Sequence, residues 1–115
     1  MIFLSNAFSL QMLNLDKVST VVVKPLTEEE VKELLSNEFT SAVGHLDTAN
    51  VLSSTLGINI PMNRINISLT PGDVLVVAQL TGGRLPEGST TLPEGFSFKY
   101  AKVVLVAEIK WKKGG

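Results

Sequence analysis

The sequence predicts a single α/β (α+β) domain in which one β-sheet is flanked by helices. Short runs of aliphatic and β-branched residues alternate with two segments that carry helix-capping signals. The chain has 115 residues, of which 44% are hydrophobic and 18% charged. That length supports one hydrophobic core but not two, so we expect one domain over residues 1–115. Strands and helices in mixed order favour a sheet with helices packed against it.

Two strands are predicted near the N-terminus. Residues 2–5 begin with three apolar side chains and lead into a turn at Ser5-Asn6, as expected of a short buried strand. Residues 18–24 are rich in β-branched side chains, which favour the extended backbone. Pro25 restricts the conformation of the residue before it, so we expect the second strand to end there.

Two helices are predicted from their terminal residues. Thr27 and Glu30 have the spacing of a capping box, and the helix that they begin is expected to run to about Leu35. Apolar side chains recur at helical spacing over residues 48–56, which predicts the second helix. Gly57 suits the left-handed residue that follows the end of a helix.

The second half of the chain predicts three more strands. Residues 64–69 alternate between apolar and polar side chains, the pattern of a half-buried strand. A Pro-Gly turn over residues 70–73 then leads to a strand over residues 74–80, so a hairpin is expected. Residues 81–95 are rich in Gly and Pro and predict an irregular loop. The last strand is expected over residues 101–111, followed by a frayed tail.

Composition and charge exclude several functional classes. The formal net charge is −1, with 10 Lys and Arg against 11 Asp and Glu, so long nucleic acid is not an expected partner. No apolar run is long enough to cross a bilayer and the N-terminus lacks a secretory signal, so we expect no membrane partner and a cytoplasmic location. One histidine and no cysteine cannot supply the usual zinc ligands, and we expect no metal and no cofactor.

His45 is the only histidine, so it is the only side chain of a type that ordinarily titrates near neutral pH. Gly44 disfavours a helix interior, whereas Asp47 and Thr48 are favoured N-caps, so we expect His45 in the turn before the second helix. A continuous helix from Ser41 is the alternative. Backbone N–H groups at a helix N-terminus attract anions, and a histidine beside them can act as a general acid toward a bound phosphate.

Two arginines stand where their guanidinium groups can reach a ligand. Arg64 begins a predicted strand, and Arg84 lies in the Gly-rich loop. A guanidinium can hold a phosphate through two parallel hydrogen bonds, so both arginines are candidate phosphate ligands. Glu87 follows Arg84 by three residues and can orient that arginine or a ligand hydroxyl. An ordinary turn carboxylate is the other interpretation of Glu87.

Several segments of the chain resemble the viral ring nucleases. These are small anti-CRISPR proteins of archaeal viruses, phages and mobile elements that destroy the second messenger cyclic tetra-adenylate. The resemblance extends over roughly residues 2–110 and implies a mixed sheet of about five strands flanked by helices. It is carried by residues 4–9, residues 40–48, the pair Asn63-Arg64 and residues 84–88, in that order.

The resemblance also implies roles for individual residues. His45 occupies the position of the family's catalytic histidine, and Arg84 and Glu87 occupy positions of catalytic support. The implied ligand-binding positions are Asn6, Ser9, Gly44, Arg64 and Gln79. For Asn6 and Ser9, formation of a turn or a cap is an equally good explanation.

The expected function is therefore that of a metal-independent phosphodiesterase, which cleaves cyclic tetra-adenylate to linear di-adenylates ending in 2′,3′-cyclic phosphate and so silences type III CRISPR signalling. A homodimer is the expected active species, because a twofold axis would give a cyclic tetranucleotide two copies of His45. A binding module that sequesters a cyclic nucleotide without cutting it is the main alternative. A transcriptional or structural viral protein is a third.

Overall fold

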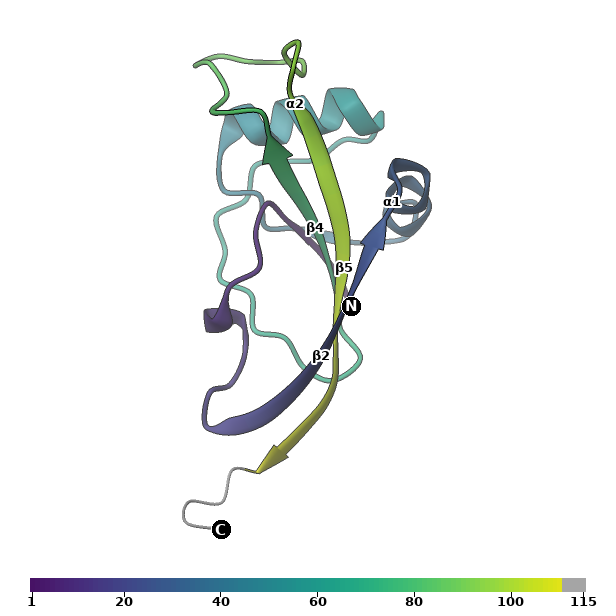
Figure 1. The fold of residues 1–115 in the computed structure, drawn as a ribbon, viewed down its shortest axis with the longest axis vertical. Helices are drawn as coiled ribbons and strands as arrows, with labels where there is room; N and C mark the ends of the chain where they lie inside the picture. The colour runs from purple at the N-terminus through teal and green to yellow at the C-terminus, as the bar shows by residue number, and fades with distance from the viewer. Residues whose placement is uncertain (111–115) are drawn as a thin grey trace.

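The chain folds around a five-stranded mixed sheet with the strand order β2-β5-β4-β1-β3 (Figure 1). A computed structural model describes residues 1–110. The predicted α+β fold with one sheet and flanking helices is confirmed. The elements in chain order are β1 (Ile2–Ser5), a 3-10 helix (Leu10–Met12), β2 (Lys17–Leu26), α1 (Glu28–Leu35), β3 (Thr40–Ser41), α2 (Leu46–Leu56), β4 (Val74–Thr81) and β5 (Ser97–Lys110).

Parallel strand pairs occupy one half of the sheet and antiparallel pairs the other. β1 pairs in parallel with β3 on one side and with β4 on the other. β5 pairs antiparallel with both β4 and β2. The three parallel strands therefore end at one edge of the sheet, the upper edge in Figure 1, where the arrowhead of β4 lies.

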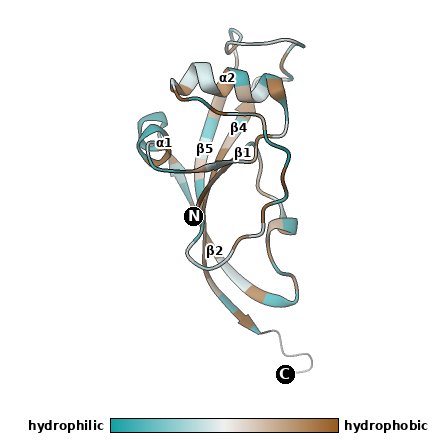
Figure 2. Cartoon of the chain, turned by 180° about the vertical axis from the view of Figure 1, so that it is seen from behind, coloured by the Kyte–Doolittle hydropathy of each residue, from teal (hydrophilic) through white to brown (hydrophobic). Residues whose placement is uncertain are grey.

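A hydrophobic cluster covers each face of the sheet. Both α1 and α2 lie on one face, in front of the sheet in Figure 2. Val31 of α1 and Leu52 of α2 are buried in one cluster with Leu4 of β1. The other face is covered by Ile67 and Leu69, which belong to the extended segment before β4. The central strands β1 and β4 are thus buried on both sides, although helices cover only one of them.

The segment over residues 64–69 is not a strand, so the predicted strand and its hairpin with β4 are both wrong. β4 already has β1 on one side and β5 on the other, which leaves no place for a further strand beside it. Ile67 and Leu69 are nonetheless only 5% and 4% exposed, because the segment crosses the face of the sheet. The N–H of Leu69 donates to the carbonyl of Met12 at 2.8 Å. The alternating pattern therefore indicated which side chains are buried, and it did not indicate that the segment pairs as a strand.

The predicted end of the second strand at Pro25 is also wrong, since β2 continues to Leu26. Pro25 pairs with Ala101 of β5 in an unbroken register. Among the described strands, β2 is the outer one on its side of the sheet. An edge strand tolerates a residue without an N–H, because one side of its backbone needs no partner within the sheet.

The last strand begins four residues earlier than predicted. Ser97 pairs with Thr81 at the end of β4, so the loop between the two strands closes as a long hairpin. The sequence between residues 97 and 100 therefore belongs to β5 and not to the irregular loop. The predicted end of this strand at residue 111 and the tail after it lie outside the described residues.

Both predicted helices are confirmed. The hydroxyl of Thr27 accepts a hydrogen bond from the N–H of Glu30 at 3.2 Å, and the Glu30 carboxylate accepts one from the N–H of Thr27 at 3.0 Å. Gly57 follows α2 with a φ of +68°, the left-handed conformation that its position predicted. No helix in residues 1–110 has the length and apolar character needed to cross a membrane.

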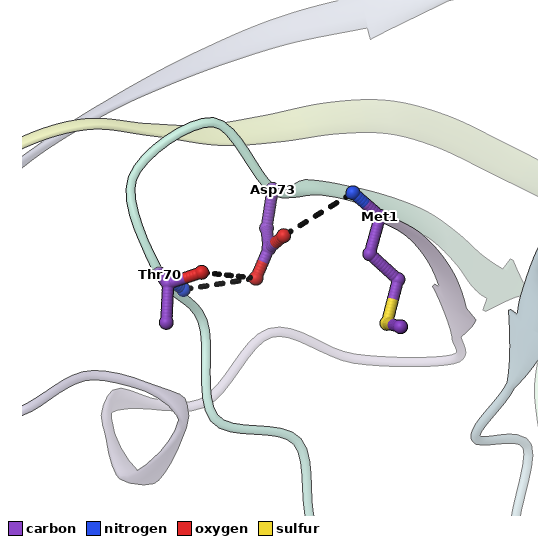
Figure 3. A network of polar contacts seen from close by, with 3 residues as sticks. All are labelled: Met1, Thr70 and Asp73. Atoms are coloured by element: carbon purple, nitrogen blue, oxygen red, sulfur yellow. Dashed lines mark hydrogen bonds and ion pairs between the residues drawn. The ribbon is translucent and has the colours of Figure 1, made fainter.

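A polar network ties the start of β1 to the turn before β4 (Figure 3). One carboxylate oxygen of Asp73 accepts hydrogen bonds from the N–H and the hydroxyl of Thr70, each at 2.9 Å. The other oxygen forms an ion pair with the α-amino group of Met1 at 3.3 Å. Burial raises the pKa of the Asp73 carboxyl, but the contacts with Thr70 and Met1 lower it by more, so the net pKa is below its ordinary value.

We expect Asp73→Asn to lower the free energy of unfolding at pH 7 by about 1 kcal/mol, because it removes the ion pair and weakens the bonds from Thr70. The folded pKa of Asp73 lies below the unfolded one, so its contribution is complete above about pH 4 and is lost as the pH falls through the folded pKa. Urea unfolding from pH 7 to pH 2.5 measures this difference. Asp16→Asn, in an exposed loop, is the control, and a difference that is unchanged in acid would contradict the account.

Candidate functional site

The segments that follow the three parallel strands meet at the upper edge of the sheet. Leu4 of β1 pairs with Ser41 of β3, and the N–H of Ala42 donates to the carbonyl of Leu4 at 2.7 Å. Ser5 at the end of β1 pairs with Val77 of β4. Ligands of sheets with parallel strands commonly bind where the carboxyl ends of the strands meet. The three segments that carry the candidate residues therefore start where a ligand is expected to bind.

The turn after β3 is held in place by the chain after α2. The hydroxyl of Ser41 donates to the carbonyl of Pro61, and the side-chain amide of Asn63 donates to the carbonyl of Ser41, each at 2.7 Å. The N–H of Asn63 donates to the carbonyl of Val43 at 2.8 Å. Ser41 is only 4% exposed, so these bonds are shielded from water. They fix the backbone that leads into α2.

Arg64, the residue after Asn63, also donates a hydrogen bond to the turn and lies beside Gly44. Its Nε donates to the Gly44 carbonyl at 2.8 Å. A Cβ built on Gly44 would come within 3.4 Å of the Arg64 Cγ, so glycine allows the arginine side chain to cross closely over the turn. Arg64 was expected at the start of a strand, which is wrong because its segment is not one. Its guanidinium stabilises the turn immediately before His45.

His45 is the N-cap residue of α2 and has an extended backbone, with φ −122° and ψ 130°. Its imidazole makes no capping hydrogen bond. The prediction that it lies just before the helix is confirmed, and the alternative of a continuous helix from Ser41 is wrong. The helix begins at Leu46, so the expectation that Asp47 or Thr48 caps it is also wrong. The turn held by Asn63 and Arg64 ends at Gly44, so His45 caps the helix and the helical backbone begins at Leu46.

The loop between β4 and β5 lies along α2. The N–H of Gly88 donates to the Asp47 carboxylate at 3.1 Å, near the start of the helix. The hydroxyl of Ser54 donates to the carbonyl of Thr90 at 2.8 Å, near its end. These two bonds tie the Gly-rich loop to one helix at both ends, beside α2 at the top of Figure 1. Arg84 belongs to the part of the loop next to the helix N-terminus.

A hollow of about 560 Å³ lies between the start of α2 and this loop, and we call it the His45 hollow. It brings together three of the predicted site residues, His45, Arg84 and Glu87, from segments about 40 positions apart. Asp47 and Thr48 also line it, although their sequence positions predicted only a capping role. Their signal was present, since they are polar residues two and three positions after His45. The complete lining is His45, Asp47, Thr48, Arg84, Leu85 and Glu87.

The remaining predicted residues lie outside this hollow. Asn6 and Gln79 line a separate hollow of about 350 Å³ on the face of the sheet opposite the helices, together with Val77 and Val103. Ser9 lines a third, of about 270 Å³. The Ser9 hydroxyl accepts a hydrogen bond from the N–H of Gln11 at 3.2 Å and so caps the 3-10 helix. Capping was one of the two roles that the sequence predicted for this serine.

The fold and the order of these segments agree with a known group of viral proteins. Residues 2–98 match the family described as STIV B116-like. The chain belongs to the STIV B116-like family. This B116-like chain is 46% identical over 89 residues to the uncharacterized protein 26 of Sulfolobus islandicus filamentous virus (isolate Iceland/Hveragerdi), an alignment that covers 76% of the chain and 74% of the relative.

Two further relatives extend the comparison. The uncharacterized protein ORF117 of Acidianus two-tailed virus is 33% identical to the B116-like chain over 98 residues, covering 77% of the chain and 83% of the relative. The solved structure of B116 of Sulfolobus turreted icosahedral virus matches 90% of the chain and 97% of its own, with a TM-score of 0.73 and 24% identity. That likeness shows a shared fold. The viral character expected from the sequence resemblance is supported by the family match and by the two viral relatives at 46% and 33% identity.

The Gly-rich loop of the B116-like chain offers a matched pair of substitutions. A Cβ on Gly82 (φ +107°) would lie 2.6 Å from the Gly95 carbonyl oxygen and 2.9 Å from the Phe96 Cα, whereas a Cβ on Gly88 (φ +81°) meets nothing within 4 Å. We therefore expect Gly88→Ala to cost about 1 kcal/mol of stability through backbone strain alone. Gly82→Ala adds a clash with backbone and should cost roughly 2–4 kcal/mol. Equal unfolding midpoints of the two variants in urea would contradict this placement of the loop.

Proposed function

We propose that this protein is a metal-independent phosphodiesterase that cleaves cyclic tetra-adenylate into linear di-adenylates ending in 2′,3′-cyclic phosphate. The observation that carries the proposal is the His45 hollow, where one imidazole, one guanidinium and the carboxylates of Asp47 and Glu87 meet at a helix N-terminus. By removing the messenger, the enzyme would silence the type III CRISPR effectors that the messenger activates. The viral relatives are consistent with such a role.

In the proposed reaction, the nucleophile belongs to the substrate. The ribose 2′-oxygen attacks the neighbouring phosphorus and loses its proton to water, while the bond from phosphorus to the 5′-oxygen breaks. His45 donates a proton to the departing 5′-oxygen as general acid. Arg84 stabilises the negative charge of the pentacoordinate phosphorus, and Glu87 orients Arg84 or the 2′-hydroxyl. Because these groups supply acid, charge and orientation, the proposed step uses no metal and no cofactor.

The N-terminus of α2 contributes to phosphate binding. The helix has 11 residues, and its N-cap residue, His45, lines the His45 hollow. The free backbone N–H groups of the first turn and the positive end of the helix dipole therefore lie next to this hollow. Asp47 is the one acidic residue in that turn. Its carboxylate accepts the N–H of Gly88, so it anchors the loop that carries Arg84. We assign Asp47 a positioning role and the helix N-terminus the role of anion site.

The other candidate residues are assigned to the wider ligand. Gly44 and Arg64 form the turn before His45, so they position the imidazole and bring a second guanidinium to the edge of the sheet. Asn6 and Gln79 place two side-chain amides on one apolar-walled surface, and a side-chain amide can pair with the hydrogen-bonding edge of adenine. Ser9 lies near the same end of β1 and has the weakest support, because its hydroxyl already caps a helix.

We expect His45→Ala to slow cleavage of cyclic tetra-adenylate by a factor of roughly 10²–10⁴, the usual contribution of a general acid, with little loss of binding. Arg84→Ala should weaken binding as well, because it removes charge-assisted hydrogen bonds to phosphate. Single-turnover kinetics and calorimetric titration separate the two effects. Lys99→Ala, a cation outside the His45 hollow, is the control. An unchanged rate in His45→Ala would remove this residue from the mechanism.

We also propose that the active species is a homodimer with a twofold axis. A cyclic tetranucleotide has opposite linkages related by such an axis, and each protomer supplies one His45. His45, Arg84 and Glu87 are all exposed, so a single protomer leaves the bound ring open to water. β2 and β5 also leave aliphatic side chains exposed on both faces of the sheet, and an interface on either face would cover some of them. They are Val22, Val23, Val106 and Ile109.

Analytical ultracentrifugation at the concentration of the activity assay tests the assembly. We expect the mass of two chains, and a specific activity that falls when dilution dissociates the dimer. A protein that sediments only as a monomer and still cleaves at its full rate would show that one protomer suffices.

A further inference from the structure

Residues 42–44 connect the end of β3 to His45, the N-cap residue of α2. One residue of a distant segment, Asn63, holds this connection at two points. It donates its backbone N–H to the carbonyl of Val43 at 2.8 Å and its side-chain amide to the carbonyl of Ser41 at 2.7 Å. The nearer of the two points lies two residues before His45.

The contacts of Asn63 are shielded from water. Ser41 is 4% exposed, Val43 is fully buried and Asn63 itself is half-buried. The hydroxyl of Ser41 also donates to the carbonyl of Pro61, so the end of β3 and the segment around Asn63 are joined in both directions. A buried carbonyl that loses its donor must either stay unpaired, which is unfavourable, or move with its backbone toward another donor.

The side chain of Asn63 acts on β3 as a hydrogen-bond donor. Its Nδ2 faces the carbonyl oxygen of Ser41, which can accept a hydrogen bond and cannot donate one. The substitution Asn63→Asp keeps the shape of the side chain and the backbone N–H, but it sets an oxygen against that carbonyl oxygen without a hydrogen between them. It therefore tests this one contact with little change in volume.

The place of the His45 imidazole depends on the backbone that Asn63 holds. The carbonyl of Val43 is bound two residues before His45, and α2 begins at the residue after it. The imidazole is exposed and makes no capping hydrogen bond, so its position follows from the backbone on either side. Displacement of a reacting group by about 1 Å can cost on the order of 10²-fold in rate. A small shift of residues 42–44 is therefore enough to separate His45 from a phosphate held by Arg84.

We propose that Asn63 is a positioning residue for the general acid, and that its two hydrogen bonds set the place of the His45 imidazole against a phosphate bound at the N-terminus of α2. The inference rests on the proposed phosphodiesterase function. Asn63 is not among the residues that line the His45 hollow, so it acts through the backbone and not on the ligand. Its substitution should lower kcat and leave the affinity for cyclic tetra-adenylate nearly unchanged, because Arg84 remains.

The nature of the leaving group distinguishes a displaced acid from a loosened fold. An oxygen leaving group needs the proton of His45, whereas a sulfur in place of the 5′-oxygen leaves as a thiolate without one. We expect Asn63→Asp to cleave cyclic tetra-adenylate about 10- to 100-fold more slowly than the parent protein, and the 5′-sulfur analogue at nearly the parent rate. His45→Ala should show the same contrast more strongly. A merely structural role would slow both substrates equally.

Asn59→Asp is the matched control. Asn59 is exposed, lies four residues before Asn63 and undergoes the same change of charge, so both substrates should be cleaved at the parent rate. Asn63→Ala removes the donor without adding a charge, and it repeats the test if Asn63→Asp does not fold.

A second measurement needs no activity. His45 is the only histidine, so its imidazole gives a single Hε1–Cε1 cross-peak in the NMR spectrum. We expect this cross-peak to shift or broaden in Asn63→Asp and to stay in place in Asn59→Asp. The inference is overturned if the folded Asn63 variant cleaves the all-oxygen ring at the parent rate, slows both substrates equally, or leaves the cross-peak unmoved. If the parent protein cleaves neither substrate, the proposed function fails, and the cross-peak alone decides whether Asn63 positions His45.

Discussion

Parallel pairing of β1 with both of its neighbours determines where the candidate catalytic residues lie. Because β3 and β4 run in the same direction as β1, all three strands release the chain at one edge of the sheet. The segment after β3 becomes the turn that carries His45, and the segment after β4 becomes the loop that carries Arg84 and Glu87. Reversal of any one of these strands would send its following segment to the opposite edge. The strand topology therefore decides which segments can form the site, and the side chains on those segments decide its chemistry.

Hydrogen bonds to backbone then refine this coarse placement. The bonds from Asn63 and Arg64 hold the turn before His45, and the bond from Gly88 to Asp47 brings the Gly-rich loop onto the first turn of α2. The residues that act on the ligand in our proposal are exposed, and hydrogen bonds from neighbouring residues, of which Asn63 and Asp47 are half-buried, hold their segments in position. Such an arrangement suits catalysis, which needs reactive groups that are accessible and fixed in position.

Signals within a short stretch of the sequence correctly predicted the features that depend on interactions between near neighbours in the chain. The capping box at Thr27 and Glu30 and the glycine after α2 depend on neighbours within one turn, and both were predicted correctly. Residues 64–69 show the limit of such signals, because alternation reports which side chains are buried and not what their backbone pairs with. Pro25 was misjudged for a related reason, since its cost depends on whether the strand lies at an edge of the sheet. The two residues of β3 are too few to produce a pattern.

The candidate site was predicted from the sequence in part. His45, Arg84 and Glu87, for which the resemblance implied roles, line one hollow, whereas Asn6, Gln79 and Ser9 line two others. Distances between segments far apart in the chain arise only from the packed sheet, so single-sequence reasoning reaches them only by resemblance.

Incubation of the protein with labelled cyclic tetra-adenylate in the presence of EDTA, followed by separation of the products, tests the proposed function most directly. The account predicts conversion of the ring to linear di-adenylates with a 2′,3′-cyclic phosphate end, at a rate that EDTA does not change. Recovery of the intact ring after prolonged incubation would contradict the account. If the intact ring were recovered bound to the protein, sequestration would replace cleavage as the function.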